Sequence, residues 1–164
     1  MATRLKNLSD LDAAPLPEAR GWRVGVVVAD YHRQITRRLL DGCIRTLMQC
    51  GIKEKDIRVV WVPGAFELPA GAQMLAGASK VEAIVCLGCV IKGETKHDEY
   101  INQAVATGIT QLSLALKKPV IFGLLTTQNL RQAKDRAGGR HGNKGVEAAL
   151  TAVKMIALHR KLKR

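Results

Sequence analysis

Four short apolar runs, separated by stretches with helical periodicity, constrain the fold of this chain more than any other feature. They span residues 23–29, 57–62, 83–91 and 120–125, and Val and Ile occupy many successive positions in them. A run that is apolar on both faces is typical of a strand inside a parallel sheet, covered by helices on either side. The runs therefore predict a sheet of four parallel strands.

The stretches between these runs repeat apolar residues at intervals of three or four, as an amphipathic helix does. The first stripe covers residues 35–48 and ends before Gly51, where a helix C-terminus favours glycine. Strands that alternate with helices imply right-handed βαβ units, so we predict an α/β fold with helices on both faces of the sheet. The two later stripes are Ile101, Val105, Gly108, Leu112 and Leu116, and then Val146, Leu150, Val153 and Ala157.

The chain is long enough for one globular domain with its own core, since it has 164 residues and 47% of them are hydrophobic. We expect this domain to span residues 21–164 and a flexible arm to span residues 1–20. The arm has charges and prolines but no apolar segment of the kind that a secretory signal needs. The sequence contains no run of about 18 apolar residues that would predict a membrane span. The cysteines do not call for an oxidising compartment, so the expected location is the cytoplasm.

The segment CVIKGETKHDEY, residues 89–100, indicates a buried strand that passes through Gly93, Glu94 and Thr95 into a helix beginning near His97. The free N–H groups and the positive dipole end of a first helical turn attract an anion such as phosphate. Gly93 leaves room for a ligand, and the imidazole of His97 can exchange protons near neutral pH. The alternative is an ordinary capped turn in which Thr95 caps the helix.

Two further segments place aromatic or charged side chains after a strand. In WVPGAFELP, residues 61–69, an exposed Phe66 and the acceptor Glu67 would lie at the carboxyl end of the sheet, where open α/β folds bind ligands. The alternative is that Phe66 belongs to the core. In residues 120–145, a strand end is followed by a short helix and a glycine-rich loop, with Arg136 and Lys144 as candidate anion ligands.

The cysteines and the glycine-rich loop do not predict a metal, redox or nucleoside-triphosphate site. Cys86 and Cys89 form a C-x-x-C pair, but residues three apart on a strand point to opposite faces, and no second pair supplies further metal ligands. Cys43 and Cys50 fall on one helical face, as buried small residues do. The loop lacks the G-x-x-x-x-G-K-[ST] pattern of a P-loop. We therefore expect no metal site.

The formal net charge of +12 raises a second hypothesis, in which the chain is a non-enzymatic protein that binds nucleic acid by neutralising phosphates. The positive residues are scattered along the sequence, however, and aromatic residues for base stacking make up only 4% of the chain. Most of the charge is therefore interpreted as solvated surface. The residues concerned are Arg33, Arg37, Arg38, Lys53, Lys55, Lys117, Lys118 and the tail HRKLKR from position 159.

Four blocks of the sequence resemble the 6,7-dimethyl-8-ribityllumazine synthases, the enzymes of the penultimate step of riboflavin biosynthesis. The blocks are VPGAFELP, LGCVIKGETKHDEYI, VIFGLLTT and RAGGRHGNKG, in that family's order and spacing, and the resemblance covers residues 23–158. It implies a flavodoxin-like three-layer α/β/α sandwich and a transferase that needs no metal or organic cofactor. A related alternative is an archaeal-type riboflavin synthase, which is built on a similar fold.

The resemblance also implies a reaction and an assembly. The family condenses 5-amino-6-(D-ribitylamino)uracil with 3,4-dihydroxy-2-butanone 4-phosphate through an imine, and it releases phosphate and water as the lumazine ring closes. Most of the gain in rate is expected to come from holding the two substrates together. The family forms pentamers, and the short turn at residues 137–144 is similar to that of members in which twelve pentamers make a 60-subunit shell.

Residue by residue, the resemblance assigns roles within these blocks. His97 matches the histidine that moves protons, and Phe122 matches a ring that the neighbouring subunit contributes. The carboxylate of Glu94 would repel phosphate unless its side chain turns outward and only its backbone N–H is used. The pyrimidine and its ribityl chain are assigned to Tyr31, Ala65, Phe66, Glu67, Cys89, Val90, Ile91 and Phe122, and the phosphate to Glu94, Thr95, Arg136 and Lys144.

Overall fold

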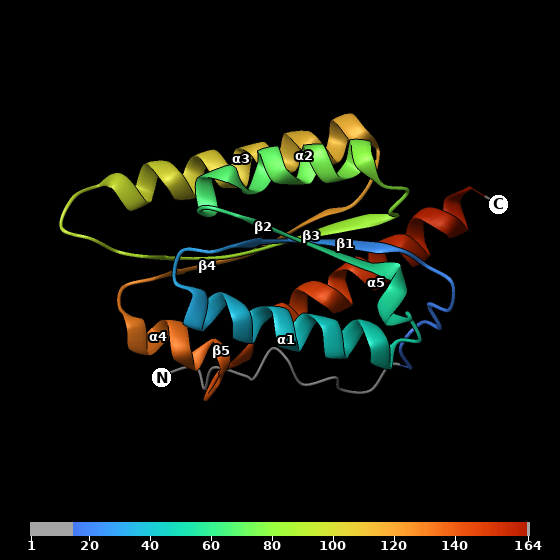
Figure 1. Cartoon of the computed structure of the whole chain (residues 1–164), viewed down its shortest axis with the longest axis horizontal. Coiled ribbons are helices and arrows are strands. Elements are labelled where there is room, and N and C mark those ends of the chain that lie inside the picture. The colour runs from blue at the N-terminus through green and yellow to red at the C-terminus, as the bar shows by residue number, and fades with distance from the viewer. Residues whose placement is uncertain (1–14, 164) are drawn as a thin grey trace, which may run out of the picture.

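The four predicted strands form one parallel sheet, in the order β2-β1-β3-β4 (Figure 1). The structure is a computed structural model that describes residues 15–163. The observed strands match the predicted runs closely, and the largest difference is that the last strand continues to Thr127. The strands are β1 (Val24–Ala29), β2 (Ile57–Val62), β3 (Ala83–Ile91) and β4 (Val120–Thr127).

Helices cover both faces of the sheet, so the predicted α/β fold with a four-stranded parallel sheet is confirmed (Figure 1). One face carries α2 (Leu68–Ala78) and α3 (His97–Leu116), and the other carries α1 (Arg33–Gln49), α4 (Leu130–Asp135) and α5 (Lys144–Leu162). None of the helices in the described range is long and apolar enough to cross a membrane. The short elements are the 3₁₀ turns η1 (Glu54–Asp56) and η2 (Ala65–Glu67) and the hairpin of β5 (Ala137–Gly139) and β6 (Gly142–Asn143).

The central strand β3 is buried on both faces and separates two hydrophobic clusters. Cys86 belongs to the cluster that contains residues of α2 and α3, and Cys89 to the cluster that contains residues of α1 and α5. The two cysteines therefore point to opposite faces, as predicted. Both thiols are free, and burial raises the pKa of each to about 12. Neither thiol is ionised near neutral pH.

The apolar stripe predicted for the last helix faces the core at most of its positions. Val153 is buried, and Leu150 and Ala157 are partly buried and pack against the same hydrophobic cluster. Further small side chains on α5, which the stripe did not include, are buried and let the helix approach its neighbours closely. The buried residues of α5 are Gly145, Ala148, Ala149, Ala152, Val153 and Ile156.

Asn143 fastens the start of α5 to α1. Its side-chain oxygen accepts a hydrogen bond from the N–H of Gly145 at 2.8 Å, and its amide donates to the carbonyl oxygen of Arg38 at 3.0 Å. Gly145 lies so close to α1 that a Cβ atom at this position would overlap the carbonyl oxygen of Leu39. This contact fixes the position of the α4–α5 loop against the rest of the fold.

The last residues of the expected N-terminal arm lie against the domain. Ala19 is fully buried, and its N–H donates to the carbonyl oxygen of Cys50 at 2.8 Å. Leu16 packs against the hydrophobic cluster beneath the sheet. Residues 1–14, which make up most of the expected arm, lie outside the described range. The packed part of the domain therefore begins before residue 21.

Replacing Gly145 with alanine should lower the free energy of unfolding by at least about 2 kcal/mol, because the added methyl group forces α5 away from α1. Gly77→Ala in α2 is the matched control, since a Cβ atom there meets nothing within 4 Å. This control should stabilise the fold slightly, by roughly 0.5 kcal/mol. Urea unfolding measures both changes, and equal effects would show that the α1–α5 contact is not tight.

Candidate active site

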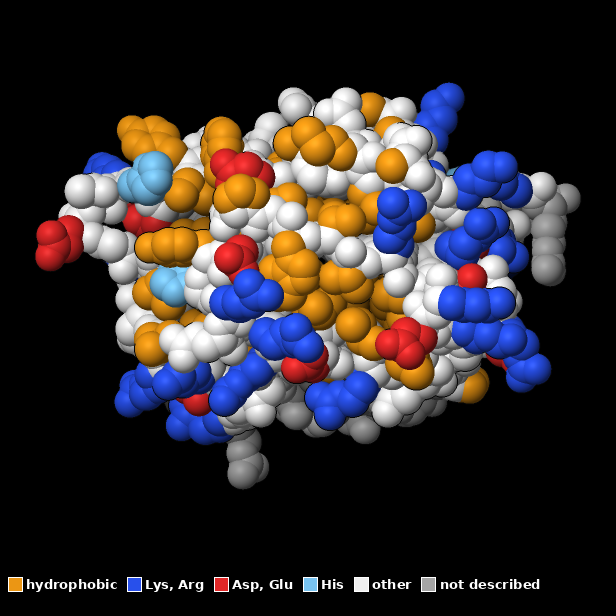
Figure 2. Space-filling model, in the orientation of Figure 1, with side chains coloured by type: hydrophobic (Ala, Val, Ile, Leu, Met, Phe, Trp, Pro, Cys, Tyr) orange, Lys and Arg blue, Asp and Glu red, His pale blue; other side chains and the backbone are white. Residues whose placement is uncertain are grey.

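A hollow of about 460 Å³ opens at the carboxyl edge of the sheet, and we call it the first hollow. It lies at the left end of the molecule in Figure 1, where parallel strands finish side by side. Histidine and hydrophobic side chains gather at the same end of the surface in Figure 2. Its lining comes from the ends of β1, β2 and β3 and the start of α3: Tyr31, His32, Gly64, Ala65, Phe66, Glu67, Cys89, Val90, Ile91, Gly93, Thr95, His97, Asp98 and Ile101.

Most of the residues predicted for the pyrimidine and its ribityl chain line the first hollow, and two of them present exposed rings. Tyr31 is 70% exposed and Phe66 is 60% exposed. The alternative in which Phe66 belongs to the core is therefore wrong. The chain turns sharply at Pro63 and Gly64 into η2, which buries Ala65 and leaves the Phe66 ring outside.

Glu67 both lines the first hollow and holds its own turn. One carboxylate oxygen, Oε2, accepts a hydrogen bond from the N–H of Gly64 at 3.0 Å. This bond closes η2 and fixes the direction in which the neighbouring Phe66 projects. The other carboxylate oxygen is the acceptor that Glu67 can offer to a ligand.

His97 is the first residue of α3, as predicted, and its helix is capped only weakly. Lys96 occupies the capping position without a side-chain hydrogen bond, and the Thr95 hydroxyl accepts from the N–H of His97 at 3.4 Å. The alternative in which Thr95 is the N-cap residue is therefore wrong, because Lys96 holds that position. Within the described residues, Thr95 contributes only this one hydrogen bond to the start of the helix. A Cβ atom at Gly93 would meet nothing within 4 Å, so the loop before the helix leaves space for an anion.

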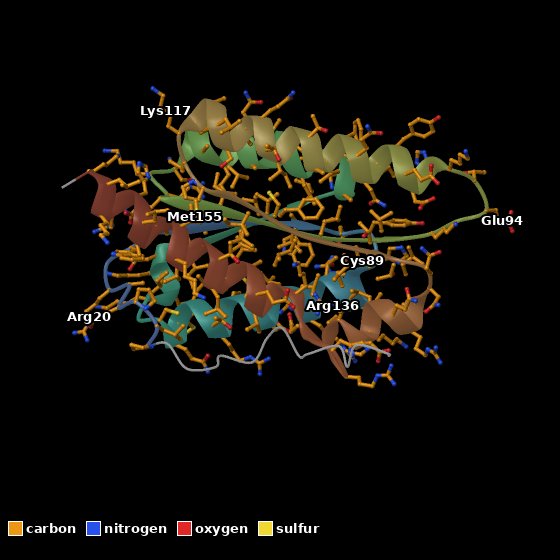
Figure 3. All side chains as sticks on the ribbon, turned by 180° about the vertical axis from the view of Figure 1, so that it is seen from behind. Arg20, Cys89, Glu94, Lys117, Arg136 and Met155 are labelled. Carbon is orange, nitrogen blue, oxygen red and sulfur yellow. The ribbon has the colours of Figure 1, made fainter. Side chains whose placement is uncertain are left out.

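Glu94 does not line the first hollow. Figure 3 shows its side chain at the outermost turn of the loop between β3 and α3, pointing away from the rest of the molecule. The Glu94 carboxylate therefore does not oppose an anion bound at the start of α3. This orientation satisfies the condition under which Glu94 can belong to a phosphate-binding turn.

Two residues of the first hollow were missed by the sequence analysis, namely His32 and Asp98. His32 adopts a left-handed conformation with φ of 59°, and its ring lies edge-on to Tyr31 with the ring centroids 4.6 Å apart. Partial burial lowers the pKa of His32 below its usual value of 6.5, so the ring is neutral near pH 7. Asp98 has a buried carboxylate oxygen, Oδ1, without a hydrogen-bond partner. His32 could have been found from the sequence, because it follows the end of the buried strand β1 by only three residues.

Phe122 and Lys144 lie elsewhere, on a second hollow of about 460 Å³ along the edge strand β4. The second hollow is bounded by the end of α3, by β4 and by α5, and Figure 3 looks onto this side of the molecule. Its lining is Ser113, Pro119, Val120, Ile121, Phe122, Lys144, Glu147, Ala148, Thr151 and Met155. The structure thus divides the predicted site residues between two surfaces.

Arg136 and Lys144 share one partially buried carboxylate, that of Glu147, which the sequence analysis also missed. Nη2 of Arg136 donates to Oε2 of Glu147 at 3.3 Å and lies 3.0 Å from Oε1. Nζ of Lys144 donates to Oε2 at 3.1 Å. Nη1 of Arg136 donates to the carbonyl oxygen of His141 at 2.8 Å, which orients the guanidinium. The result is a cluster of two cations and one carboxylate beside the second hollow.

The described residues contain no group of three or more His, Cys, Asp or Glu side chains placed to hold a metal ion. The side chains and backbone of the first hollow themselves offer several kinds of chemistry. They offer stacking rings, hydrogen-bonding groups at a strand end, an open helix start and the imidazole of His97. Such a set can bind an aromatic ring beside an anion and move protons between them.

Comparisons with known proteins give a consistent result. A family model described as 6,7-dimethyl-8-ribityllumazine synthase matches residues 21–160. A protein of that name from Parabacteroides distasonis is 48% identical over 156 residues, which cover 95% of this chain and 98% of the relative. Another from Cytophaga hutchinsonii is 50% identical over 157 residues, covering 96% and 98% respectively. A third, from Phocaeicola vulgatus, is 46% identical over 164 residues, covering 100% and 98%.

Proposed function

This chain belongs to the 6,7-dimethyl-8-ribityllumazine synthase family, and we propose that its two hollows are the two halves of one active site shared between neighbouring subunits. The protein is an enzyme, a transferase with lumazine synthase activity in riboflavin biosynthesis, and its substrates are small molecules. The observation that carries the proposal is the division of the site. His97 lies on the first hollow, whereas Phe122 and Lys144 lie on the second.

The proposed contact joins two different surfaces, so it is heterologous, and a heterologous contact gives a ring of subunits when its rotation closes. Exposed apolar side chains beside the second hollow support this contact, since large apolar surfaces mark interaction sites. Among them, Met155 is 41% exposed, Leu158 47% and Phe122 37%. The ring proposed is the pentamer of the family. The short β5–β6 hairpin is the feature that favours a shell of twelve pentamers.

The pyrimidine is proposed to bind in the first hollow. The rings of Tyr31 and Phe66 provide stacking surfaces, and Phe122 of a neighbouring subunit closes the pocket. Ala65 lines the turn beside the ring, and the free carboxylate oxygen of Glu67 accepts from a ribityl hydroxyl. The backbone at the end of β3, in Cys89, Val90 and Ile91, reads the polar edge of the ring.

The phosphate of the second substrate is proposed to bind at the start of α3. The backbone N–H groups after Gly93, including that of Glu94, and the Thr95 hydroxyl are its ligands within one subunit. Arg136 and Lys144 of the neighbouring subunit supply the positive charge, because their present counter-ion can be exchanged for phosphate.

The proposed reaction begins with attack of the pyrimidine amine on the ketone carbon, which forms an imine and releases water. Loss of a proton from the carbon chain then expels the phosphate and leaves an enol, which becomes a ketone by proton transfer. The ribityl-bearing nitrogen attacks the carbon of this ketone, and loss of a second water completes the ring. His97, beside both sites, moves the protons. Most of the acceleration comes from the fixed orientation of the two substrates, and no metal or organic cofactor is used.

A direct assay with both substrates tests the proposed reaction, and lumazine should appear together with phosphate. Incubation with the lumazine alone tests the alternative of an archaeal-type riboflavin synthase, which would convert it to riboflavin. Riboflavin formed from the lumazine alone would contradict the proposal, because a lumazine synthase releases this compound as its product.

Changing His97 to alanine should lower kcat by roughly 10- to 1000-fold, since positioned acid–base groups contribute on this scale. The KM values should change little, because the rings and the phosphate ligands remain. His159→Ala, near the end of α5, is the control and should keep full activity. Unchanged turnover of the His97 variant at saturating substrates would refute its role in proton transfer.

Changing Arg136 to lysine should raise KM for the butanone phosphate and leave KM for the pyrimidine nearly unchanged. The charge is retained, but the paired donors of the guanidinium are lost. Arg131→Lys on the exposed side of α4 makes the same chemical change away from the second hollow and serves as the control. Steady-state kinetics separate the two substrates. Equal increases in both KM values would indicate that Arg136 only supports the end of α4.

Mixing two inactive variants tests whether the site is shared between subunits. His97→Ala damages the first hollow and Arg136→Ala the cluster beside the second, so a mixed ring contains some sites with both residues intact. Activity should therefore return when the two variants are unfolded and refolded together, but not when they are mixed as folded rings. Sedimentation of the unmixed protein measures the size of the ring or shell. Absence of recovery in a mixed ring, or a fully active monomer, would contradict the shared site.

A further inference from the structure

We propose that the end of the molecule opposite the first hollow binds the sugar–phosphate backbone of single-stranded nucleic acid. A third hollow, of about 480 Å³, lies there at the amino ends of β1 and β2. Arg20, Arg23, Lys53 and Lys55 line it, together with Gly21 and Asp56. Figure 3 shows Arg20 at the far end of the molecule from Glu94, with its side chain extended into solvent.

The positive surface continues from this third hollow to the end of α5. Nη2 of Arg160 lies 2.7 Å from a carboxylate oxygen of Glu82, and the other oxygen of Glu82 accepts from the backbone N–H of Arg23 at 3.3 Å. The Arg160 guanidinium lies over the Trp22 ring, 5.0 Å from its centroid. Trp22, Arg160 and Lys161 border an adjoining hollow. Basic residues that are far apart in the sequence therefore meet at one end, where Lys and Arg side chains gather in Figure 2.

The acidic groups of this surface do not neutralise it. The cations that line the two hollows are Arg20, Arg23, Lys53, Lys55, Arg160 and Lys161, and the carboxylates that line or contact them are Glu18, Asp56 and Glu82. Arg20 and Glu18 form an ion pair at 2.8 Å, and both side chains are exposed to solvent. Exposed pairs contribute little free energy, so Arg20 can exchange its carboxylate for a phosphate.

The shape of this surface favours a single flexible strand. The third hollow, of about 480 Å³, is concave and bordered by four cations. A single strand can turn its phosphates into such a hollow, whereas the phosphates of a duplex are held at fixed positions on a convex surface. Trp22 is only 8% exposed and is covered by Arg160, so it offers no platform for base stacking. Binding is therefore expected through phosphates, without sequence preference.

This surface is separate from the proposed active site. The residues that line the third hollow are not among those that line the first or the second hollow. The nucleic-acid hypothesis raised by the net charge therefore does not compete with the enzymatic function. Both can belong to the same subunit.

The test is binding of a fluorescent oligouridylate of about 20 nucleotides to the full chain, followed by anisotropy from roughly 50 to 200 mM salt. The double variant Lys53→Glu, Lys55→Glu alters the third hollow. Arg131→Glu, Lys134→Glu, on exposed positions of α4, changes the net charge equally and is the matched control. Lumazine synthase assays on the first variant verify that its fold is intact.

The variant of the third hollow should bind at least about tenfold more weakly at low salt, and the slope of log K against log salt should fall by about 1.4, for two lost phosphate contacts. The control should lose less than about threefold. Equal losses in the two variants would overturn the proposal, since net charge alone would explain them. Failure of the unaltered protein to bind, tighter binding of a duplex of equal length, or binding of inorganic polyphosphate alone would overturn it as well.

Discussion

The common direction of the four strands is the constraint on which the rest of the structure depends. Parallel neighbours cannot be joined by a tight turn, so a helix follows each strand, and all carboxyl ends lie at one edge of the sheet. The first hollow uses three of these ends, with Tyr31 after β1, Phe66 after β2 and Cys89 in β3. The fourth strand leads instead to α4 and Arg136. The same constraint collects the amino ends at the opposite edge, beside the basic residues.

The first hollow could be predicted in large part because its residues are local to strand ends. The composition of a buried strand makes it recognisable in the sequence, and the direction of the strand then fixes where the next two or three residues lie. Phe66 and His97 were found in this way. His32 lay within reach of the same reasoning, because it directly follows the loop after β1. The three-layer fold was predictable for the same reason, since strand and helix periods alternate without interruption.

The features that depend on packing between distant segments could not be predicted. Glu147 meets Arg136 only because α5 folds back along the loop that precedes it, and no periodic pattern indicates that contact. The close approach of Gly145 to Leu39 requires a residue without a side chain at the start of α5, and no apolar periodicity indicates that contact. Lys53 precedes β2 and Arg160 lies near the end of α5, and only the complete fold brings them to the same end of the molecule. Charge that looks scattered in sequence is therefore concentrated in space.

The carboxylate of Glu147 is a built-in counter-ion for Arg136 and Lys144. Arg136 and Lys144 are never left without a partner, because a partially buried charge without one is costly. In the proposed site, a phosphate would displace this resident carboxylate, which would return when the phosphate departs. The difference in free energy between the two states would therefore be smaller than for bare cations. A site of this kind would hold its anion briefly, as the proposed release of inorganic phosphate in every cycle requires.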